Sequence, residues 1–571
     1  MIAVLVLLVS PAVAADDDSP VLIENPFLSS SMPVDNPYLE YLLGHEAEIS
    51  GKWEVALSHY SRALQLDPKS AHLQTQISQM LIKMGKINEA VSRLEELTKT
   101  EPDYVPALMI LGQLYNAQKK VEDAIGVYEK VIKLAPDKNE AYLFLGVLYA
   151  SQREYDKART VFELLLEKDP DSIMGLYYMG SLMMETRNFD KAKEYFLKVT
   201  DENPSFDSAY LNLGVISEAG GELKDAEDFY RKALEANPHN VYAREKLARL
   251  YITDKSYDKA IREFEEMSKN MPQNIDIHLR LGLLYLQEKD FDNAISEFRI
   301  VLEARPQDID SRYYLAIALQ ELKRDDEAIE ELKKVISYDP KHTSAFLNLG
   351  MLYERHNRDA EAAKVFEEVL TFEKDKPEIY AYLGHALVQA KEYEKALQVL
   401  EGALSRFDDS DELHFTIATV YEKLGRFDDM ERHLKRTIEI DPKNADAFNY
   451  LGYSYADKGI KLEEALSLIE RALELKPDSG YIIDSLGWVY FKLGRLDEAL
   501  KALLRARDLV NDDPVLHEHL GDVYEALGDH TKAVEAWREA LKYQEKEQGL
   551  KERVEEKIGK AQHAPGRKQG S

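Results

Sequence analysis

The stretch LGQLYNAQKKVEDAIGVYEKVIKLAP, Leu111 to Pro136, shows the residue pattern that repeats along most of the chain. Gly112, Ala124 and Pro136 lie twelve residues apart, and apolar residues recur between them at helical spacing. The prolines that repeat every 34 residues are Pro68, Pro102, Pro136, Pro170, Pro204, Pro238, Pro272, Pro306 and Pro340, with Pro442 three periods further on. A fixed period of this length indicates an array of repeated structural units.

Each unit predicts two antiparallel helices joined by a short polar turn. Leu279, Leu283 and Leu286 recur at helical spacing before one such turn, and a second helical pattern follows it. Two helices cross closely where side chains are small, which explains the Gly or Ala at the eighth place and the Ala at the twentieth. Proline ends the second helix because it lacks an N–H and disfavours helix before it.

A second stretch, SLGWVYFKLGRLDEAL from Ser485 to Leu500, tests this interpretation. Glycines beside aromatic and charged residues occur both in ligand-binding loops and in structural joints. Gly487 and Ala499 occupy the eighth and twentieth places, and Gly494 falls in the turn, where a left-handed backbone is useful. Neither glycine fingerprint of a phosphate-binding loop is present, so the stretch is predicted to be a joint.

The repeat pattern resembles that of the tetratricopeptide repeat (TPR) family over nearly the whole chain. The resemblance implies an all-α, right-handed TPR solenoid of about fifteen repeats at residues 37–547, with a capping helix at 548–563. The repeats start near Pro37, Ala71, Val105, Asn139, Ile173, Asp207, Val241, Ile275, Ile309, Thr343, Pro377, Asp411, Ala445, Gly480 and Pro514.

Two places depart from the period. Near residue 408 the terminal proline is missing and Met430 replaces the usual alanine, and residues 457–465 contain one extra residue. These are hinges, binding features or sequence drift. Drift is the simplest account, because repeats tolerate insertions in their turns. A local change of curvature is expected there, not a separate domain.

The two ends of the chain differ from the array. Residues 1–15 form an apolar run ending in a small-x-small pattern, which predicts a signal peptide. No Lys or Arg precedes Lys52, so an uncleaved N-terminal anchor is the alternative. Residues 16–36 predict an exposed linker and residues 564–571 a disordered tail. The signal peptide implies a periplasmic or outer-membrane-associated protein.

The composition and the motifs of the chain disfavour several classes of function. The 73 basic and 104 acidic residues give a formal charge of −31, which disfavours nucleic acid as a partner. The chain has no cysteine. No catalytic constellation, cofactor motif or HExxH spacing occurs near His45 or near His517 and His519, and these histidines are expected to be solvated. We therefore expect no enzyme, no metal and no cofactor.

Binding of other proteins or peptides is the remaining function, because stacked helix pairs form a long concave surface. In the TPR family, particular places on the first helix of each repeat line that groove. Carried over to this sequence, they predict Met109, Leu143, Tyr177, Leu283, Asn449, Tyr453, Tyr481, Asp484, Trp488 and Phe491. For Tyr178, Tyr314 and Tyr450, packing against the next repeat is an equal alternative to lining the groove.

A closer resemblance covers Asn449 to Leu500, which looks like the paired repeats of bacterial envelope TPR proteins. That group is related to outer-membrane lipoproteins that act as adaptors for carboxyl-terminal processing proteases. The resemblance implies a non-catalytic scaffold that presents substrates to such a protease. No lipid-bearing cysteine is present, so membrane association would come through partners or an uncleaved N-terminus. The alternative is a structural scaffold of an export or exopolysaccharide assembly complex.

Overall fold

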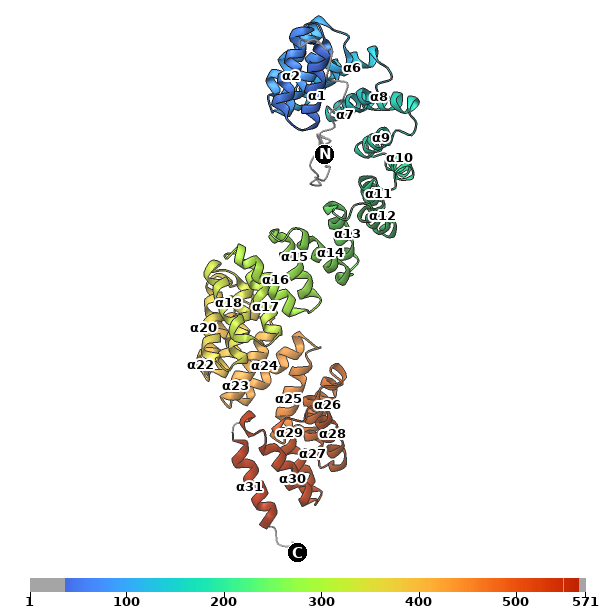
Figure 1. Ribbon diagram of the computed structural model, residues 1–571. Helices are drawn as coiled ribbons and strands as arrows, with labels where there is room; N and C mark the ends of the chain where they lie inside the picture. The colour runs from blue at the N-terminus through green and yellow to red at the C-terminus, as the bar shows by residue number, and fades with distance from the viewer. Residues whose placement is uncertain (1–35, 548, 564–571) are drawn as a thin grey trace, which may run out of the picture. The chain divides into compact units, whose positions relative to one another are not determined.

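The computed structural model describes residues 36–547 and 549–563, which are helical almost throughout (Figure 1). Within these residues, 31 α-helices and one 3-10 helix, Gln544–Lys546, follow one another. The α-helices form stacked pairs, fifteen in all, and the last helix stands alone. The predicted all-helical solenoid of about fifteen repeats with a capping helix is thus confirmed. The predicted signal peptide and tail, and the linker except Asn36, lie outside the described residues.

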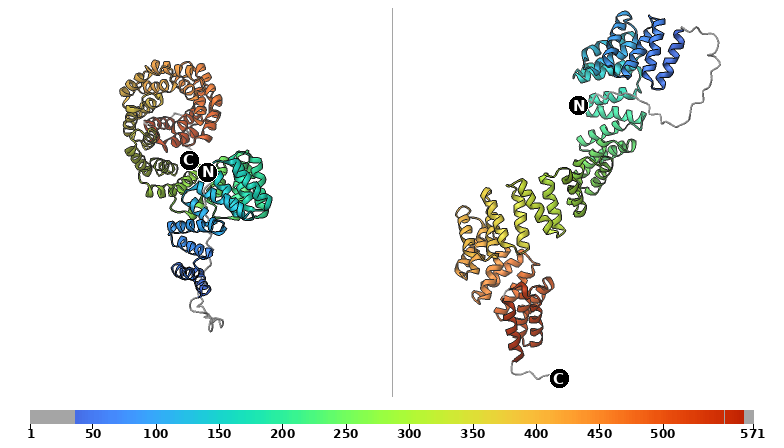
Figure 2. Two further views of the ribbon diagram at one scale, coloured as in Figure 1. Left: turned by 90° about the horizontal axis from the view of Figure 1, so that it is seen from above. Right: turned by 60° about the vertical axis from the view of Figure 1, so that its left-hand side comes forward.

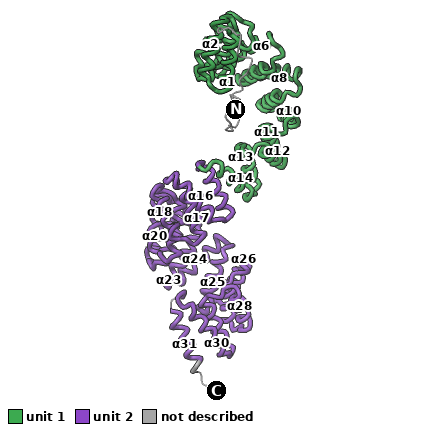
Figure 3. Tube along the Cα trace, viewed as in Figure 1, with its two compact units in different colours: residues 1–272 green, residues 273–571 purple. Residues whose placement is uncertain are grey.

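The chain divides into two compact units, residues 1–272 and 273–571 (Figure 3). In each pair we call the first, odd-numbered helix A and the second, even-numbered helix B. Unit 1 contains α1 (Pro37–Ile49), α2 (Trp53–Leu66), α3 (Ala71–Lys83), α4 (Ile87–Thr100), α5 (Val105–Ala117), α6 (Val121–Leu134), α7 (Asn139–Ser151), α8 (Tyr155–Lys168), α9 (Ile173–Glu185), α10 (Phe189–Glu202), α11 (Asp207–Ala219), α12 (Leu223–Ala236), α13 (Val241–Thr253) and α14 (Tyr257–Asn270).

Unit 2 continues the same alternation, and its repeats curve around a turn in the view from above (Figure 2). It contains α15 (Ile275–Gln287), α16 (Phe291–Ala304), α17 (Ile309–Glu321), α18 (Asp325–Tyr338), α19 (Thr343–Arg355), α20 (Asp359–Phe372), α21 (Pro377–Gln389), α22 (Tyr393–Leu404), α23 (Asp411–Lys423), α24 (Phe427–Ile440), α25 (Ala445–Asp457), α26 (Leu462–Leu475), α27 (Gly480–Lys492), α28 (Leu496–Leu509), α29 (Pro514–Ala526), α30 (His530–Leu541) and α31 (Leu550–His563).

The turn from helix A to helix B has a residue in the left-handed conformation at its centre in each of the fifteen repeats, and the lengthened turn of repeat thirteen has Lys461 as a second one. The central residues are Gly51, Gly85, Lys119, Arg153, Arg187, Gly221, Lys255, Lys289, Lys323, Asn357, Lys391, Gly425, Gly459, Gly494 and Gly528. The left-handed backbone predicted at Gly494 is confirmed, with φ +77°. Eight of the fifteen are not glycine, so glycine alone does not mark this turn in the sequence.

The eighth-place glycine is a packing joint between the two helices of a repeat. A Cβ added to Gly146 would lie 2.3 Å from the ring of Phe162 on the partner helix, and one added to Gly112 would lie 2.7 Å from Tyr128. A Cβ added to Gly487 would lie 2.6 Å from Leu503. Protein interiors leave no room for such overlaps. The prediction that the Gly487 stretch is a joint is therefore confirmed.

The A helices lie on the inner side of the curve within each unit. Neighbouring A helices contact one another, as α7 and α9 do in unit 1 and α27 and α29 in unit 2. No two successive B helices among the described residues make comparable contact. Side chains that point away from helix B on an A helix therefore face the inside of the curve.

The closest A-helix contacts coincide with the two irregular places in the sequence. They join α21 to α23 and α25 to α27. Between the first two, α22 has 12 residues where most B helices have 14. Between the second two, the lengthened turn places Lys461 in the left-handed conformation, with φ +48°. The inner face is thus most tightly curved in the second half of unit 2.

Candidate functional site

The predicted groove residues of unit 1 lie on successive A helices. Met109, Leu143 and Tyr177 belong to α5, α7 and α9, and each is half-buried against the apolar core of this unit. Tyr177 is held by two aromatic rings, with ring centroids 5.0 Å from Phe206 and 5.7 Å from Phe196. In unit 2, Leu283 on α15 is 37% exposed. These residues line A helices as expected, and their binding role stays a prediction.

The structure brings several of the C-terminal predicted residues together around His519, which the sequence did not place in the groove. The centroid of the His519 ring on α29 lies 4.0 Å from that of Trp488 on α27 and 6.2 Å from that of Tyr453 on α25. His519 also donates from Nδ1 to Asp484, at 3.0 Å from Oδ1. Phe491 stacks on Trp488 at 5.0 Å. We call these five residues the inner cluster.

His517 and His519 were expected to be solvated, and this expectation is wrong. Their residues are 5% and 4% exposed, because α29 is an A helix packed between its neighbours. Residues two apart on a helix face different sides. Accordingly, Nε2 of His517 lies 2.9 Å from the carbonyl oxygen of Asn511, whereas His519 turns toward Asp484. No group of three or more metal-ligating residues occurs in the part of the chain that the structure describes.

Trp488 is not an exposed aromatic surface. The residue is 8% exposed, its ring is stacked with His519 and Phe491, and the Lys492 ammonium lies 4.7 Å from its centroid. Its indole Nε1 nevertheless has no hydrogen-bond partner. The side-chain oxygen of Asn449 on α25 is likewise buried without a partner. Unpaired buried polar atoms are uncommon and cost about 1–3 kcal/mol each.

Tyr481 lies apart from the inner cluster. It is 60% exposed near the start of α27 and lines a small pocket with Asp512, Lys546 and Glu547. It is therefore an accessible surface residue, and any contribution it makes to binding would be at the edge of the inner face.

Carboxylates surround the hydroxyl group of Tyr453. Burial raises the pKa of Tyr453, and the negative charges of Asp484, Asp457, Glu518 and Glu547 raise it further. The hydroxyl therefore stays protonated at neutral pH and acts as a hydrogen-bond donor. Because these carboxylates come from α25, α27, α29 and the segment before α31, negative charge converges on the inner face from several elements.

The last helix closes this end of the array by ion pairs. Arg553 and Lys557 of α31 pair with Glu518 of α29 at 2.8 and 2.7 Å, and Lys557 also pairs with Asp522. Burial alone would raise the pKa of Glu518, but the hydrogen bonds from Arg553 and Lys557 outweigh it and hold the pKa below its ordinary value. Glu518 is therefore ionised, and its ion pairs hold the capping helix α31 against α29.

Tyr178, Tyr314 and Tyr450 pack against the preceding repeat and not the next one. Tyr178 stacks on Phe162 and Tyr314 on Phe298, each on the B helix before it. The hydroxyl of Tyr450 donates to Glu422 at 2.7 Å. The sequence could not decide this direction, because both neighbours of a repeat carry the same pattern.

Comparison with protein families identifies the same repeat type along the chain. A model described as "Tetratricopeptide repeat" matches residues 338–551, and another with that description matches residues 252–319 and 285–350. The model "Tetratricopeptide repeat protein 21 N-terminal ARM repeat" matches residues 50–261. Together these matches cover both units.

Among curated proteins, the chain is similar to the TPR repeat-containing protein PA4667 of Pseudomonas aeruginosa, with 39% identity over 84 residues. That alignment covers 15% of this chain and only 14% of the relative.

The similarity to solved structures is low. The APC/C hetero-tetramer Cut9–Hcn1 aligns at 15% identity and a TM-score of 0.38, covering 92% of this chain and 96% of that one. The MamA protein aligns at 23% identity and a TM-score of 0.28, covering 31% and 96%.

Proposed function

This chain belongs to the tetratricopeptide repeat proteins, which are scaffolds for protein–protein interaction, and from that premise we propose that the inner face around α25, α27 and α29 binds an extended segment of a partner protein. The observation that carries the proposal is a pair of buried polar atoms without hydrogen-bond partners beneath this face. Trp488 Nε1 is an unpaired donor and the Asn449 side-chain oxygen is an unpaired acceptor, and a partner segment reaches them once the side chains that cover them move aside. Both occupy places on the A helices that the family uses for its groove.

An extended peptide has the chemistry to satisfy both atoms. Each of its residues except proline offers one carbonyl acceptor and one N–H donor. A carbonyl would accept from Trp488, and an N–H would donate to Asn449. Making these bonds would remove the cost of leaving two buried groups unpaired. Tyr453 beside them would add a third donor, because its hydroxyl stays protonated.

Charge favours a partner segment that is neutral or basic. The carboxylates of Asp457, Asp484 and Glu547 act together on Tyr453. An acidic peptide would meet like charge at this place, and like charges at an interface cost several kcal/mol. The net charge of −31 adds a general attraction for basic surfaces.

We propose further that the protein is exported to the periplasm or the outer membrane and acts as an adaptor that presents substrates to a carboxyl-terminal processing protease. The resemblance of residues 449–500 to envelope TPR proteins and the signal-like residues 1–15 support this role. An adaptor needs no chemistry of its own, because it raises the effective concentration of substrate at the protease. Among the described residues, no helix is both long and apolar enough to cross a membrane.

The alternative is a scaffold of an export or exopolysaccharide assembly complex. Such a scaffold would hold its partners on exposed outer surfaces of the B helices, where Leu223 and Leu509 are 44% and 49% exposed. The adaptor would bind through the inner face, whereas the assembly scaffold would bind through the outer surfaces.

An affinity capture distinguishes them. The full chain is immobilised, retained envelope proteins are identified, and capture is repeated with Trp488→Phe and with Asn449→Leu. Trp488→Phe keeps an aromatic ring beside His519 and removes the N–H. Replacement of this buried residue by alanine would leave a cavity costing about 3–5 kcal/mol, so lost binding would not be separable from lost folding.

We expect a processing protease or its substrate to be retained, with at least tenfold weaker retention by both variants. Tyr242→Ala serves as the control, because Tyr242 is 75% exposed on α13. Equal retention by wild type and both variants would refute the inner-face site. Retention of export or polysaccharide machinery in that case would favour the alternative scaffold.

A further inference from the structure

One ion pair recurs inside several repeats. The fourth residue of helix A pairs with the residue nineteen places later on helix B. Arg244 pairs with Glu263 at 2.6 Å and His278 with Glu297 at 2.6 Å. Arg312 and Glu331 form the same pair in the next repeat. In each case a basic side chain meets a carboxylate across the two helices of one repeat.

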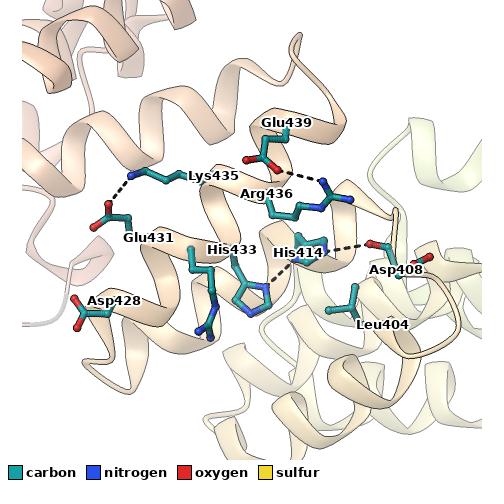
Figure 4. A pocket seen from close by; sticks show the side chains of 10 residues that line it. Leu404, Asp408, His414, Asp428, Glu431, His433, Lys435, Arg436 and Glu439 are labelled. Carbon is teal, nitrogen blue, oxygen red and sulfur yellow. Dashed lines mark hydrogen bonds and ion pairs between the residues drawn. The ribbon is translucent and has the colours of Figure 1, made fainter.

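Repeat twelve, formed by α23 and α24, has two imidazoles at these places instead. Nδ1 of His414 lies 2.9 Å from Nδ1 of His433, and the two rings converge in an open pocket (Figure 4). On its other side, His414 donates from Nε2 to the carbonyl oxygen of Asp408 at 3.4 Å. This bond leaves the lone pair of His414 on Nδ1, so His433 supplies the proton of the shared hydrogen bond.

Ion pairs surround the two imidazoles. Arg432 pairs with Asp429, Lys435 with Glu431, and Arg436 with both Asp409 and Glu439. The carboxylate-bearing residues Asp408 and Asp428 also line the pocket. The lining of the pocket thus holds four carboxylate-bearing residues against three basic ones, which are Arg432, Lys435 and Arg436.

We propose that His414 and His433 together bind one divalent transition-metal ion of the Cu²⁺ or Ni²⁺ class. An imidazole nitrogen binds such ions at about 2.0–2.1 Å, so two of them at a right angle on one ion lie about 2.9 Å apart. Right angles between neighbouring ligands belong to the square-planar and tetragonal sites that Cu²⁺ and Ni²⁺ prefer.

The site uses two protein ligands, and water completes the coordination. The backbone carbonyl on the outer nitrogen of His414 is the partner that usually orients a metal-binding histidine. Binding requires only that His433 move its proton to Nε2 and that the rings rotate so that both lone pairs meet the ion. The ion then joins α23 to α24 beside the sharply curved contact of α21 with α23.

The test uses the full chain without an affinity tag. Cu²⁺ is titrated by calorimetry, and an electron paramagnetic resonance spectrum is recorded at one equivalent. We expect one strongest site whose spectrum shows two imidazole nitrogens, with a rise in the melting temperature on binding. His433→Gln and His414→Gln each keep a hydrogen-bonding side chain, and each is expected to weaken this site at least tenfold.

His278→Gln is the matched control, because His278 holds the equivalent place in repeat eight beside Glu297. It is expected to leave the strongest site unchanged. A spectrum without two imidazole nitrogens in the wild-type chain would overturn the proposal, whatever the variants do. Unchanged affinity in His433→Gln would overturn it as well and would leave the pair as a hydrogen bond between two imidazoles.

Discussion

Gly494 and Gly126 both have open space around them, yet their backbones differ. Gly494 lies in a turn with φ +77°, whereas Gly126 lies inside α6 with an ordinary helical backbone. A side chain at a left-handed position costs about 1–2 kcal/mol, because Cβ approaches the following carbonyl oxygen. In a helix, glycine itself is unfavourable by about 0.5–1 kcal/mol relative to alanine. The same substitution therefore has opposite effects at these two residues.

We predict that Gly494→Ala lowers the free energy of unfolding by about 1 kcal/mol and that Gly126→Ala raises it by about 0.5–1 kcal/mol. Chemical denaturation followed by circular dichroism measures both. A third variant, Lys323→Gly, places glycine at a turn residue with φ +59° and is expected to stabilise the protein. Destabilisation by Lys323→Gly, or unchanged stability of Gly494→Ala, would contradict this account of the turn.

At the scale of one element, α31 is held differently from the helices before it. It has no B partner of its own, and Leu550 and Val554 bury its apolar side against α30. Its polar side is tied by Arg553 and Lys557 to Glu518. A terminal helix that is packed on one side only is the first element of a repeat array to open, because each repeat is stabilised mainly by its neighbours.

We predict that Glu518→Gln speeds hydrogen exchange in α31 and lowers its local stability by about 2 kcal/mol, because Arg553 loses its charged partner and Lys557 keeps only Asp522. The control is Glu555→Gln, on the exposed side of the same helix. Faster exchange in both variants to the same extent would mean that general charge, and not the Glu518 ion pairs, holds the helix.

The carboxylate of Glu518 makes the local stability of α31 depend on pH. Its pKa is lowered in the folded protein, so its stabilising contribution is complete above the ordinary glutamate pKa and is lost as the pH falls through the lowered value. We expect the exchange of α31 in the wild type to accelerate, after correction for intrinsic rates, below about pH 4.5, whereas Glu518→Gln lacks this step.

For the whole molecule, the large negative charge is the dominant electrostatic property. A charge of −31 spread over 571 residues repels itself in the folded state. Salt reduces this repulsion, because the screening length falls from about 30 Å at 0.01 M to about 8 Å at 0.15 M ionic strength. Exposed ion pairs are worth only about 0–1 kcal/mol each, so weakening them matters less.

We therefore predict that the melting temperature rises by a few degrees when NaCl is increased from 10 to 150 mM. Differential scanning calorimetry measures the change, and sucrose at equal osmolarity controls for effects other than screening. A fall in the melting temperature would indicate that local ion pairs outweigh the overall repulsion.

The helix pairs, their number and their internal joints could all be predicted from the sequence. The period of Gly112, Ala124 and Pro136 depends on contacts within one repeat, and such contacts occur at fixed distances along the chain. Gly487 could be recognised as a joint for the same reason. The order of the helices followed from that regularity, whereas the places that face the inner side followed from the resemblance to the TPR family.

The contacts that the inner-face residues make could not be predicted in this way. The burial of Trp488, the role of His519 between α25 and α27, and the direction in which Tyr178 packs all depend on how neighbouring repeats curve. The approach of His414 to His433 likewise depends on how α23 meets α24. Curvature is a sum of small packing differences between repeats with nearly the same pattern, so the period specifies each repeat but not which side chains of different repeats meet.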